Sequence, residues 1–193
     1  MTYVGIKFRT KIIKDDLPAD HRVSGLKYWC KVFNEKGLLP RYDCGSYGNL
    51  SFRLNDGRNS FVITASKTYL GQSMRNDCFV TVVHVDLGKR VVYSIGKRDP
   101  SSEAMLHYAI YKKRRDVQAI FHGHSSKISK NAERIGIPIT HKEEPYGTTA
   151  LVKSVLEILD ENCFIEMKNH GFLSLGKSLD DAGNLTLKLL DMC

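Results

Sequence analysis

Five short runs in the first half of the chain predict strands, and the first two of them alternate apolar with polar residues. The runs cover residues 3–9, 50–54, 60–65, 79–86 and 89–95. The first run is short and fits an edge strand. The turn-forming sequence NDGR joins the second run to the third, and Leu87 and Gly88 join the fourth to the fifth. Both pairs are therefore predicted to be hairpins.

Helical spacing begins at residues 22–36, where four apolar residues fall on one face and Gly37 follows as a C-terminal cap. Later segments predict four more helices, over 100–114, 125–135, 147–162 and 178–192. In the last of these, Ser178 and Asp181 resemble a capping box. The run 116–124 predicts a buried strand, and 163–176 predicts two short strands joined by a turn.

Hairpins interspersed with helices favour an α/β fold, a three-layer α/β/α sandwich around a largely antiparallel central sheet. A chain of 193 residues suits one such domain, and its sequence contains no repeat, low-complexity segment or linker. We therefore expect residues 1–193 to form a single domain.

Composition narrows the class of protein. Hydrophobic residues make up 42% of the chain and charged residues 26%, as in ordinary globular proteins. No apolar run approaches the roughly 20 residues that span a bilayer, and the basic N-terminus lacks the apolar core of a signal peptide. These features predict a cytoplasmic protein that does not associate with membranes. The five cysteines are scattered without a C-x-x-C pair, so neither a disulfide framework nor a cysteine zinc site is indicated.

The formal net charge of +8 is compatible with an anionic substrate, with nucleic acid or simply with solubility. The densest basic cluster, at 111–116, fits the C-terminal end of a helix. No basic motif interleaved with aromatic residues is present. Nucleic-acid binding would rest on charge alone, and we do not expect it.

Two histidines end the buried strand. In a strand, His122 and His124 project from the same face, as a bidentate metal-binding pair does, although hydrogen-bonded structural histidines have the same spacing. A third candidate, His170, lies between Asn169 and Gly171 on the predicted turn, where the glycine lets the backbone approach closely. Three histidines leave one position of Zn²⁺ open, which is the pattern of catalytic sites.

Three other segments are rich in hydroxyl and backbone N–H groups. In the sequence PSSE, Ser101 or Ser102 caps the predicted helix and Glu103 lies in its first turn. A helix start with two hydroxyls can bind phosphate, and Glu103 beside a metal can act as a general acid or base, although a plain well-capped helix has the same sequence pattern. The loop GNLS and the strand end ITAS are weaker signals of the same kind.

The order of these motifs along the chain is more specific than any one of them. GNLS, ITAS, PSSE, HGH and NHG, followed by GKSLDDA, resemble the class II aldolase/adducin family, and the resemblance covers about residues 22–190. It leaves residues 1–20 as an N-terminal extension. The family fold is an α/β/α domain around a largely antiparallel sheet, often in a homotetramer with active sites at subunit interfaces.

The resemblance also implies roles for individual residues. His122, His124 and His170 match zinc ligands, and Glu103 matches the catalytic carboxylate. The implied substrate is a small phosphorylated sugar, whose phosphate is held by segments containing Gly48, Asn49, Thr64, Ser66, Ser101 and Ser102. One departure is Lys67, which stands where the family has a glycine. Tyr146 lies near the expected position of a family tyrosine, but we do not assign it that role.

Among the reactions of the family, zinc-dependent aldol cleavage of a ketose phosphate through a metal-stabilised enediolate is ranked first. A dehydratase of the methylthioribulose-phosphate type comes second. A pentose-phosphate 4-epimerase comes third, because the resembling epimerases carry Asp where this chain has Glu103. A protein of another class, a non-catalytic adducin-like scaffold, would have lost the metal site. The three histidines and Glu103 count against that alternative.

Overall fold

The computed structural model describes residues 5–54, 58–71 and 73–193. Its main sheet contains β1 (Arg9–Lys14), β4 (Asn49–Arg53), β5 (Phe61–Thr64), β6 (Phe79–Asp86), β7 (Val91–Ile95), β8 (Ala119–Gly123), β9 (Phe164–Met167) and β10 (Gly171–Gly176). The eight strands lie in the order β1-β7-β6-β5-β4-β8-β10-β9. Among these eight strands, as far as the described residues go, only β1 and β7 pair in parallel, so the prediction of a largely antiparallel sheet is confirmed.

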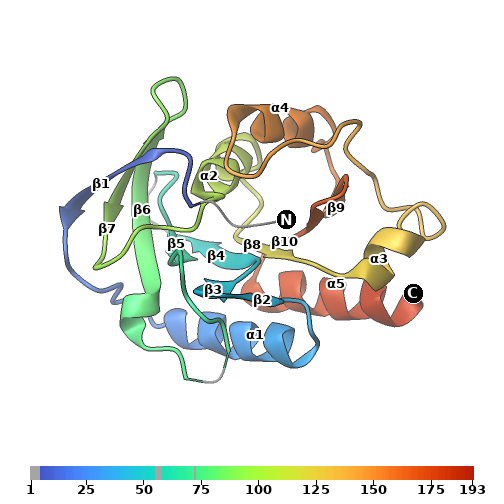
Figure 1. Ribbon diagram of the computed structural model, residues 1–193, viewed down its shortest axis with the longest axis horizontal. Helices are drawn as coiled ribbons and strands as arrows, with labels where there is room; N and C mark the ends of the chain where they lie inside the picture. The colour runs from blue at the N-terminus through green and yellow to red at the C-terminus, as the bar shows by residue number, and fades with distance from the viewer. Residues whose placement is uncertain (1–4, 55–57, 72) are drawn as a thin grey trace.

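Helices cover both faces of this sheet (Figure 1). On one face lie α1 (Val23–Glu35) and α5 (Leu179–Met192), and on the other lie α2 (Ala104–Lys113) and α4 (Thr149–Glu157). Each face packs its own apolar cluster against the strands. The predicted three-layer α/β/α architecture is therefore confirmed.

Smaller elements surround this frame. The short helix α3 (Ser126–Asn131) follows β8, and the 3-10 helix η1 (Asn76–Cys78) precedes β6. A second, two-stranded sheet pairs β2 (Arg41–Tyr42) with β3 (Gly45–Ser46) immediately before β4. This small sheet lies close to the end of the main sheet at which β4 begins and β8 ends.

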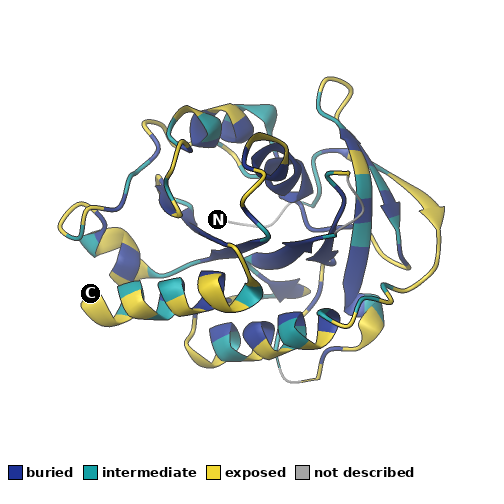
Figure 2. Ribbon diagram, turned by 180° about the vertical axis from the view of Figure 1, so that it is seen from behind, coloured by how far each residue is buried: buried dark blue, intermediate teal, exposed yellow. Residues whose placement is uncertain are grey.

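The central strands are buried on both faces (Figure 2), and every residue of β4, β5, β8 and β10 is buried. Buried strands of this kind are usually apolar throughout. β4 is an exception, because Asn49, Ser51 and Arg53 alternate with Leu50 and Phe52. Its polar side chains all point to one face, toward α2, and require partners there.

The predicted first strand was misplaced. The structure has β1 at Arg9–Lys14 instead of residues 3–9, although β1 is an edge strand as expected. The alternation that suggested the earlier strand has another cause, because Ile6 and Phe8 pack against the core outside any strand. Residues 3–4 of the predicted strand and turn residues 55–57 lie outside the described residues. Both hairpin pairings, β4 with β5 and β6 with β7, are confirmed.

The predicted helices are present but shorter. The helix expected at 100–114 begins at Ala104, and Glu103 occupies its N-cap position without a side-chain cap from either serine. The expected cap of α5 forms, because Ser178 Oγ accepts a hydrogen bond of 3.0 Å from the backbone N–H of Asp181. Because α2 begins at Ala104, Glu103 is the residue that immediately precedes the helix and not a residue of its first turn.

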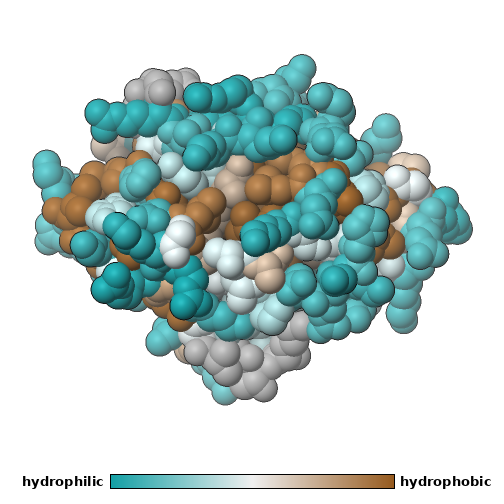
Figure 3. Space-filling model, turned by 90° about the horizontal axis from the view of Figure 1, so that it is seen from above, coloured by the Kyte–Doolittle hydropathy of each residue, from teal (hydrophilic) through white to brown (hydrophobic). Residues whose placement is uncertain are grey.

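None of the helices in the described ranges is both long enough and apolar enough to cross a membrane. Figure 3 shows apolar side chains in an interrupted band across the face seen from above, with hydrophilic side chains on both sides. Two exposed apolar side chains belong to β1, Ile12 (47% exposed) and Ile13 (53% exposed). The face seen from above is therefore mixed in character, and the edge strand β1 separately carries two exposed apolar side chains.

Candidate active site

His122 and His124 lie at the end of β8, where the strand alternation places both rings on one face. Their ring centroids are 4.7 Å apart. His122 is 1% exposed, and its Nδ1 is 2.8 Å from the carbonyl oxygen of Phe172 on the neighbouring strand. A carbonyl oxygen can only accept, so Nδ1 donates and Nε2 keeps its lone pair. This hydrogen bond fixes both the orientation and the tautomer of the ring.

His170 enters the same space from the turn between β9 and β10. Its ring centroid is 5.1 Å from that of His122 and 5.5 Å from that of His124. The following Gly171 makes this approach possible, because an added Cβ would lie 2.5 Å from the carbonyl oxygen of Gly123. One ligand atom from each of the three rings lies within 4.8 Å of the others. Residues distant in sequence therefore converge as expected.

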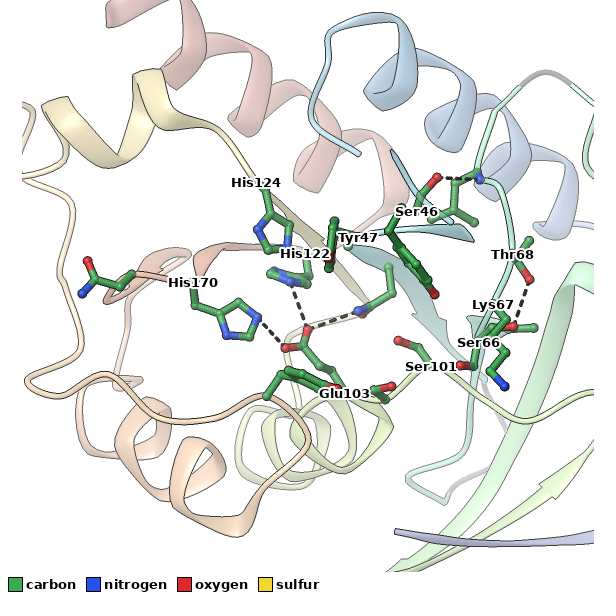
Figure 4. A pocket seen from close by; sticks show the side chains of 18 residues that line it. Ser46, Tyr47, Ser66, Lys67, Thr68, Ser101, Glu103, His122, His124 and His170 are labelled. Atoms are coloured by element: carbon green, nitrogen blue, oxygen red, sulfur yellow. Dashed lines mark hydrogen bonds and ion pairs between the residues drawn. The ribbon is translucent and has the colours of Figure 1, made fainter. Parts of the chain in front are cut away.

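Glu103 joins the histidines from the start of α2 (Figure 4). Its Oε1 is 2.9 Å from His170 Nε2, and its Oε2 is 3.2 Å from His122 Nε2. Asn49 on β4 donates from Nδ2 to Oε2 over 3.1 Å. Glu103 is 3% exposed, so Asn49 and His170 take the place of water around the carboxylate, whereas the deprotonated Nε2 of His122 has no proton to donate to it.

The electrostatics of the cluster favour an ionised carboxylate and neutral histidines on β8. Burial alone would raise the pKa of Glu103, but His122 and His170, with hydrogen bonds from His170 and Asn49, hold it below its ordinary value. Burial lowers the pKa of His122, and it lowers the pKa of His124 to about 3. For His170 burial works in the same direction, but the charge of Glu103 outweighs it and raises the pKa.

These residues fit a zinc ion. Zinc in proteins prefers nitrogen and sulfur ligands, and it takes imidazole in the neutral form. His122 and His124 are held neutral, and the hydrogen bond at His122 Nδ1 leaves Nε2 facing Glu103 and the other rings. With His170 as a third nitrogen donor, the set leaves one position of the ion open for a substrate or water.

The cluster forms one end of a cavity of about 230 Å³. Ser66, Lys67 and Ser101 lie at the other end, which we call the hydroxyl end (Figure 4). Lys67 has a left-handed backbone (φ 52°), a conformation that favours glycine and costs other residues of order 1 kcal/mol. The backbone is strained at Lys67, and the cationic side chain of this residue forms part of the cavity wall.

Five of the six residues expected in the phosphate-binding segments line this cavity, namely Gly48, Asn49, Ser66, Ser101 and Ser102. Thr64 is the exception. It is 1% exposed, and its Oγ1 accepts from the backbone N–H of Leu50 over 3.4 Å, behind the cavity wall. Gly48 has φ 90°, and a Cβ there would lie 2.7 Å from the carbonyl oxygen of His122. This glycine lets the loop approach β8, the strand that carries His122.

Sequence reasoning did not assign several other lining residues. Tyr47 lies beside His124 with ring centroids 5.7 Å apart, and Tyr146 contributes another aromatic wall. The remaining unassigned lining residues are Tyr42, Ser46, Ala65, Thr68, Leu70 and Asn169. In the sequence Tyr42 and Tyr47 stand close to the glycines of a loop, and this pattern could have indicated that they line the site.

The family model of the class II aldolase and adducin N-terminal domain matches residues 26–193. An L-fuculose phosphate aldolase of Methanocaldococcus jannaschii is 33% identical over 156 residues, which cover 74% of this chain and 79% of the relative. A methylthioribulose-1-phosphate dehydratase of Methylococcus capsulatus is 29% identical over 178 residues, covering 79% of this chain and 81% of the relative.

Solved structures agree in fold. An L-fuculose 1-phosphate aldolase superposes with a TM-score of 0.72 at 22% identity, covering 91% of this chain and 86% of that one. A second, from Thermus thermophilus, has a TM-score of 0.66 at 19% identity and covers 87% and 88%. Such identities speak for the fold alone, whereas the family model also matches the sequence. The chain belongs to the class II aldolase and adducin N-terminal domain family.

Proposed function

We propose that the protein is a zinc-dependent lyase that cleaves a small ketose phosphate by a retro-aldol reaction. The observation that carries the proposal is the convergence of three histidine nitrogens within 4.8 Å, beside the buried carboxylate of Glu103. The similarity to L-fuculose phosphate aldolases supports the choice of reaction.

In this proposal His122, His124 and His170 hold the zinc. The ion, when bound, supplies a Lewis acid that stabilises negative charge developing on the carbonyl oxygen of the substrate. Glu103 accepts the proton of the substrate hydroxyl as the carbon–carbon bond breaks, and it returns a proton to the carbon that received the electron pair. Its lowered pKa keeps it ionised and able to accept.

The hydroxyl end of the cavity is proposed to bind the phosphate. Ser66 and Ser101 offer hydroxyl donors there, and Lys67 adds a positive charge. Binding the phosphate away from the reacting carbons orients the substrate, and orientation lowers the barrier to reaction. Zinc and phosphate would then fix the two ends of one small molecule inside the same cavity.

A dehydratase is the second candidate, because a methylthioribulose-1-phosphate dehydratase matches 79% of this chain. The products distinguish the two reactions. We would load the protein with zinc, incubate it with a panel of ketose phosphates and identify the products by mass spectrometry. Release of a triose phosphate supports aldol cleavage, and loss of water without cleavage supports the dehydratase. A protein that retains no zinc after loading and converts none of the substrates would refute both reactions and favour the adducin-like scaffold.

We also propose that the chain assembles as a homotetramer, as its family resemblance implies. The exposed Ile12 and Ile13 on the edge strand β1 are compatible with burial between copies. Light scattering coupled to size exclusion measures the assembly. A mass close to that of one 21.9 kDa chain would contradict the proposal.

A further inference from the structure

A second cavity adjoins the histidine cluster. Its volume is about 710 Å³, and it lies between α3, residues 139–141 and the turn that follows β9. His124, Asn169 and His170 line both cavities, so the two spaces meet at the histidines. In Figure 4 His170 lies at the opposite end of the labelled side chains from Lys67. The second cavity is therefore reached from the metal site by moving away from the hydroxyl end.

The most unusual group in this cavity is the carboxylate of Glu166 on β9. It is 3% exposed, and its Oε1 accepts from Ser129 Oγ over 2.5 Å. Its Oε2 has no hydrogen-bond partner among the described residues. A buried acceptor without a partner is unfavourable, and a ligand that donates to it removes that cost. The remaining residues of β9 are apolar and buried, so an apolar residue at this position would suit the strand better.

The rest of the lining indicates what can meet this acceptor. The carboxylates of Glu133 and Glu166 are balanced by Lys130 and Lys168, so the lining carries no net charge that would favour an ammonium group. Ile139 is the one large apolar residue in the described lining, so an apolar chain would find little contact. Ser126 and Thr140 instead add hydroxyls. A neutral group that donates hydrogen bonds, a hydroxyl, matches these surroundings best.

We propose that the second cavity binds the hydroxylated end of the substrate that is remote from the phosphate, with a hydroxyl donating to Glu166 Oε2. This inference rests on the proposed lyase function, because it requires a substrate that extends past the metal site. Glu166 is then a specificity-determining residue. It selects a ketose phosphate whose aldehyde product carries a hydroxyl over one whose product ends in an apolar chain.

The synthetic direction of the aldol reaction tests the selection directly. Dihydroxyacetone phosphate would be condensed with glyceraldehyde or with propanal, which has the same carbon chain without the hydroxyls. We expect the zinc-loaded protein to prefer glyceraldehyde by at least roughly tenfold in kcat/KM, because an unpaired buried acceptor rejects the analogue that lacks the donor.

Two variants and a matched control locate the preference. In Glu166→Gln and Glu166→Leu the preference should fall to about twofold or less, since neither side chain offers the second carboxylate oxygen that accepts the substrate hydroxyl. The Gln variant keeps an oxygen for Ser129, which guards against misfolding. Glu133→Gln makes the same chemical change at an exposed carboxylate of the same cavity and should keep the full preference. An unchanged preference in both Glu166 variants overturns the inference.

A binding measurement separates this inference from the lyase proposal. Glycerol added to the ¹⁵N-labelled wild-type protein should shift the amide signals of Ser126, Ser129 and Thr140, and propan-1-ol should not. The shifts should persist in Glu133→Gln and disappear in Glu166→Leu. These results without aldol turnover would sink the lyase proposal and leave the cavity assignment standing. Turnover with no glycerol shifts, or with equal shifts in wild type and Glu166→Leu, would support the lyase proposal and overturn the cavity assignment.

Discussion

Two pairs of polar residues connect β4 to α2, and the two pairs differ in their surroundings and in the role that we expect of them. Asn49 on β4 donates to Glu103 at the start of α2 over 3.1 Å. Two residues further along β4, Ser51 Oγ lies 2.8 Å from Nδ1 of His107, one helical turn further along α2. The spacing of two on a strand and four on a helix keeps both pairs on the facing surfaces. We call them the outer pair and the inner pair.

The surroundings of the two pairs explain the difference. The outer pair opens onto the cavity and the converging histidines. The inner pair is enclosed, because Ser51 Oγ also contacts the hydroxyl of Tyr111 over 2.7 Å, and Arg53 stacks on that ring at 4.7 Å. A buried histidine with a hydrogen-bond partner is therefore no sign of a metal site. What distinguishes the outer cluster is the convergence of several ring nitrogens on one point.

The largest effect should come from the carboxylate of the outer pair. Glu103→Gln should lower the rate of aldol cleavage by roughly 10²–10⁴-fold, because the amide cannot accept the proton. Zinc content should stay at the wild-type level, since the three histidines are unchanged. Steady-state kinetics and metal analysis on the same preparation measure both. A variant with full turnover would remove Glu103 from the proposed mechanism.

The inner pair should affect stability instead of chemistry. His107→Leu keeps a similar volume but removes the ring nitrogen that meets Ser51, and it should lower the free energy of unfolding by about 1–3 kcal/mol. Urea denaturation measures the change. The expected zinc content is that of the wild type. Loss of zinc in a folded His107→Leu protein would show that the two pairs are not separate.

The inner pair also predicts a dependence of stability on pH. Burial, opposed in part by Glu103, lowers the pKa of His107 to about 3. The unfolded chain therefore takes up this proton below about pH 6.5, whereas the folded protein resists it until about pH 3. The stabilisation is complete above the unfolded pKa and is lost as pH falls toward the folded one. The advantage of wild type over His107→Leu should shrink between these values, and a constant difference would contradict the assignment.

The smallest effects come from truncating the two strand partners, Ser51 of the inner pair and Asn49 of the outer pair. Ser51→Ala should lower stability by about 1 kcal/mol and leave kcat/KM unchanged. Asn49→Ala should lower kcat/KM several-fold, roughly the loss of one hydrogen bond to the carboxylate of Glu103. Parallel denaturation and kinetic measurements are required. The same phenotype in both variants would erase the distinction.

Much of this arrangement could be predicted from local patterns. The alternation along 116–124 placed His122 and His124 on one face of a strand, and the glycine after His170 indicated a close approach. The hairpins and helices followed from periodicity, and their sum gave the layered fold. These features depend on residues near one another in the sequence, where period and turn chemistry act directly.

Other features depend on tertiary contacts, and local patterns could not reveal them. Ile6 and Phe8 alternate because they pack on the core, which imitates a strand. Glu103 enters the helix rather than lying in its first turn, since it faces the histidines and Asn49. Glu166 in an apolar strand resembles an exposed edge residue until the second cavity is seen. In each case the partner lies far away in the chain.

The proposed zinc site is tested most directly by the zinc content of the purified protein after dialysis against a zinc buffer and then against zinc-free buffer. We expect about one zinc per chain in the wild type and in His107→Leu, and none in folded His122→Ala. Zinc-free wild-type protein, or His122→Ala with wild-type zinc content, would contradict the proposed site.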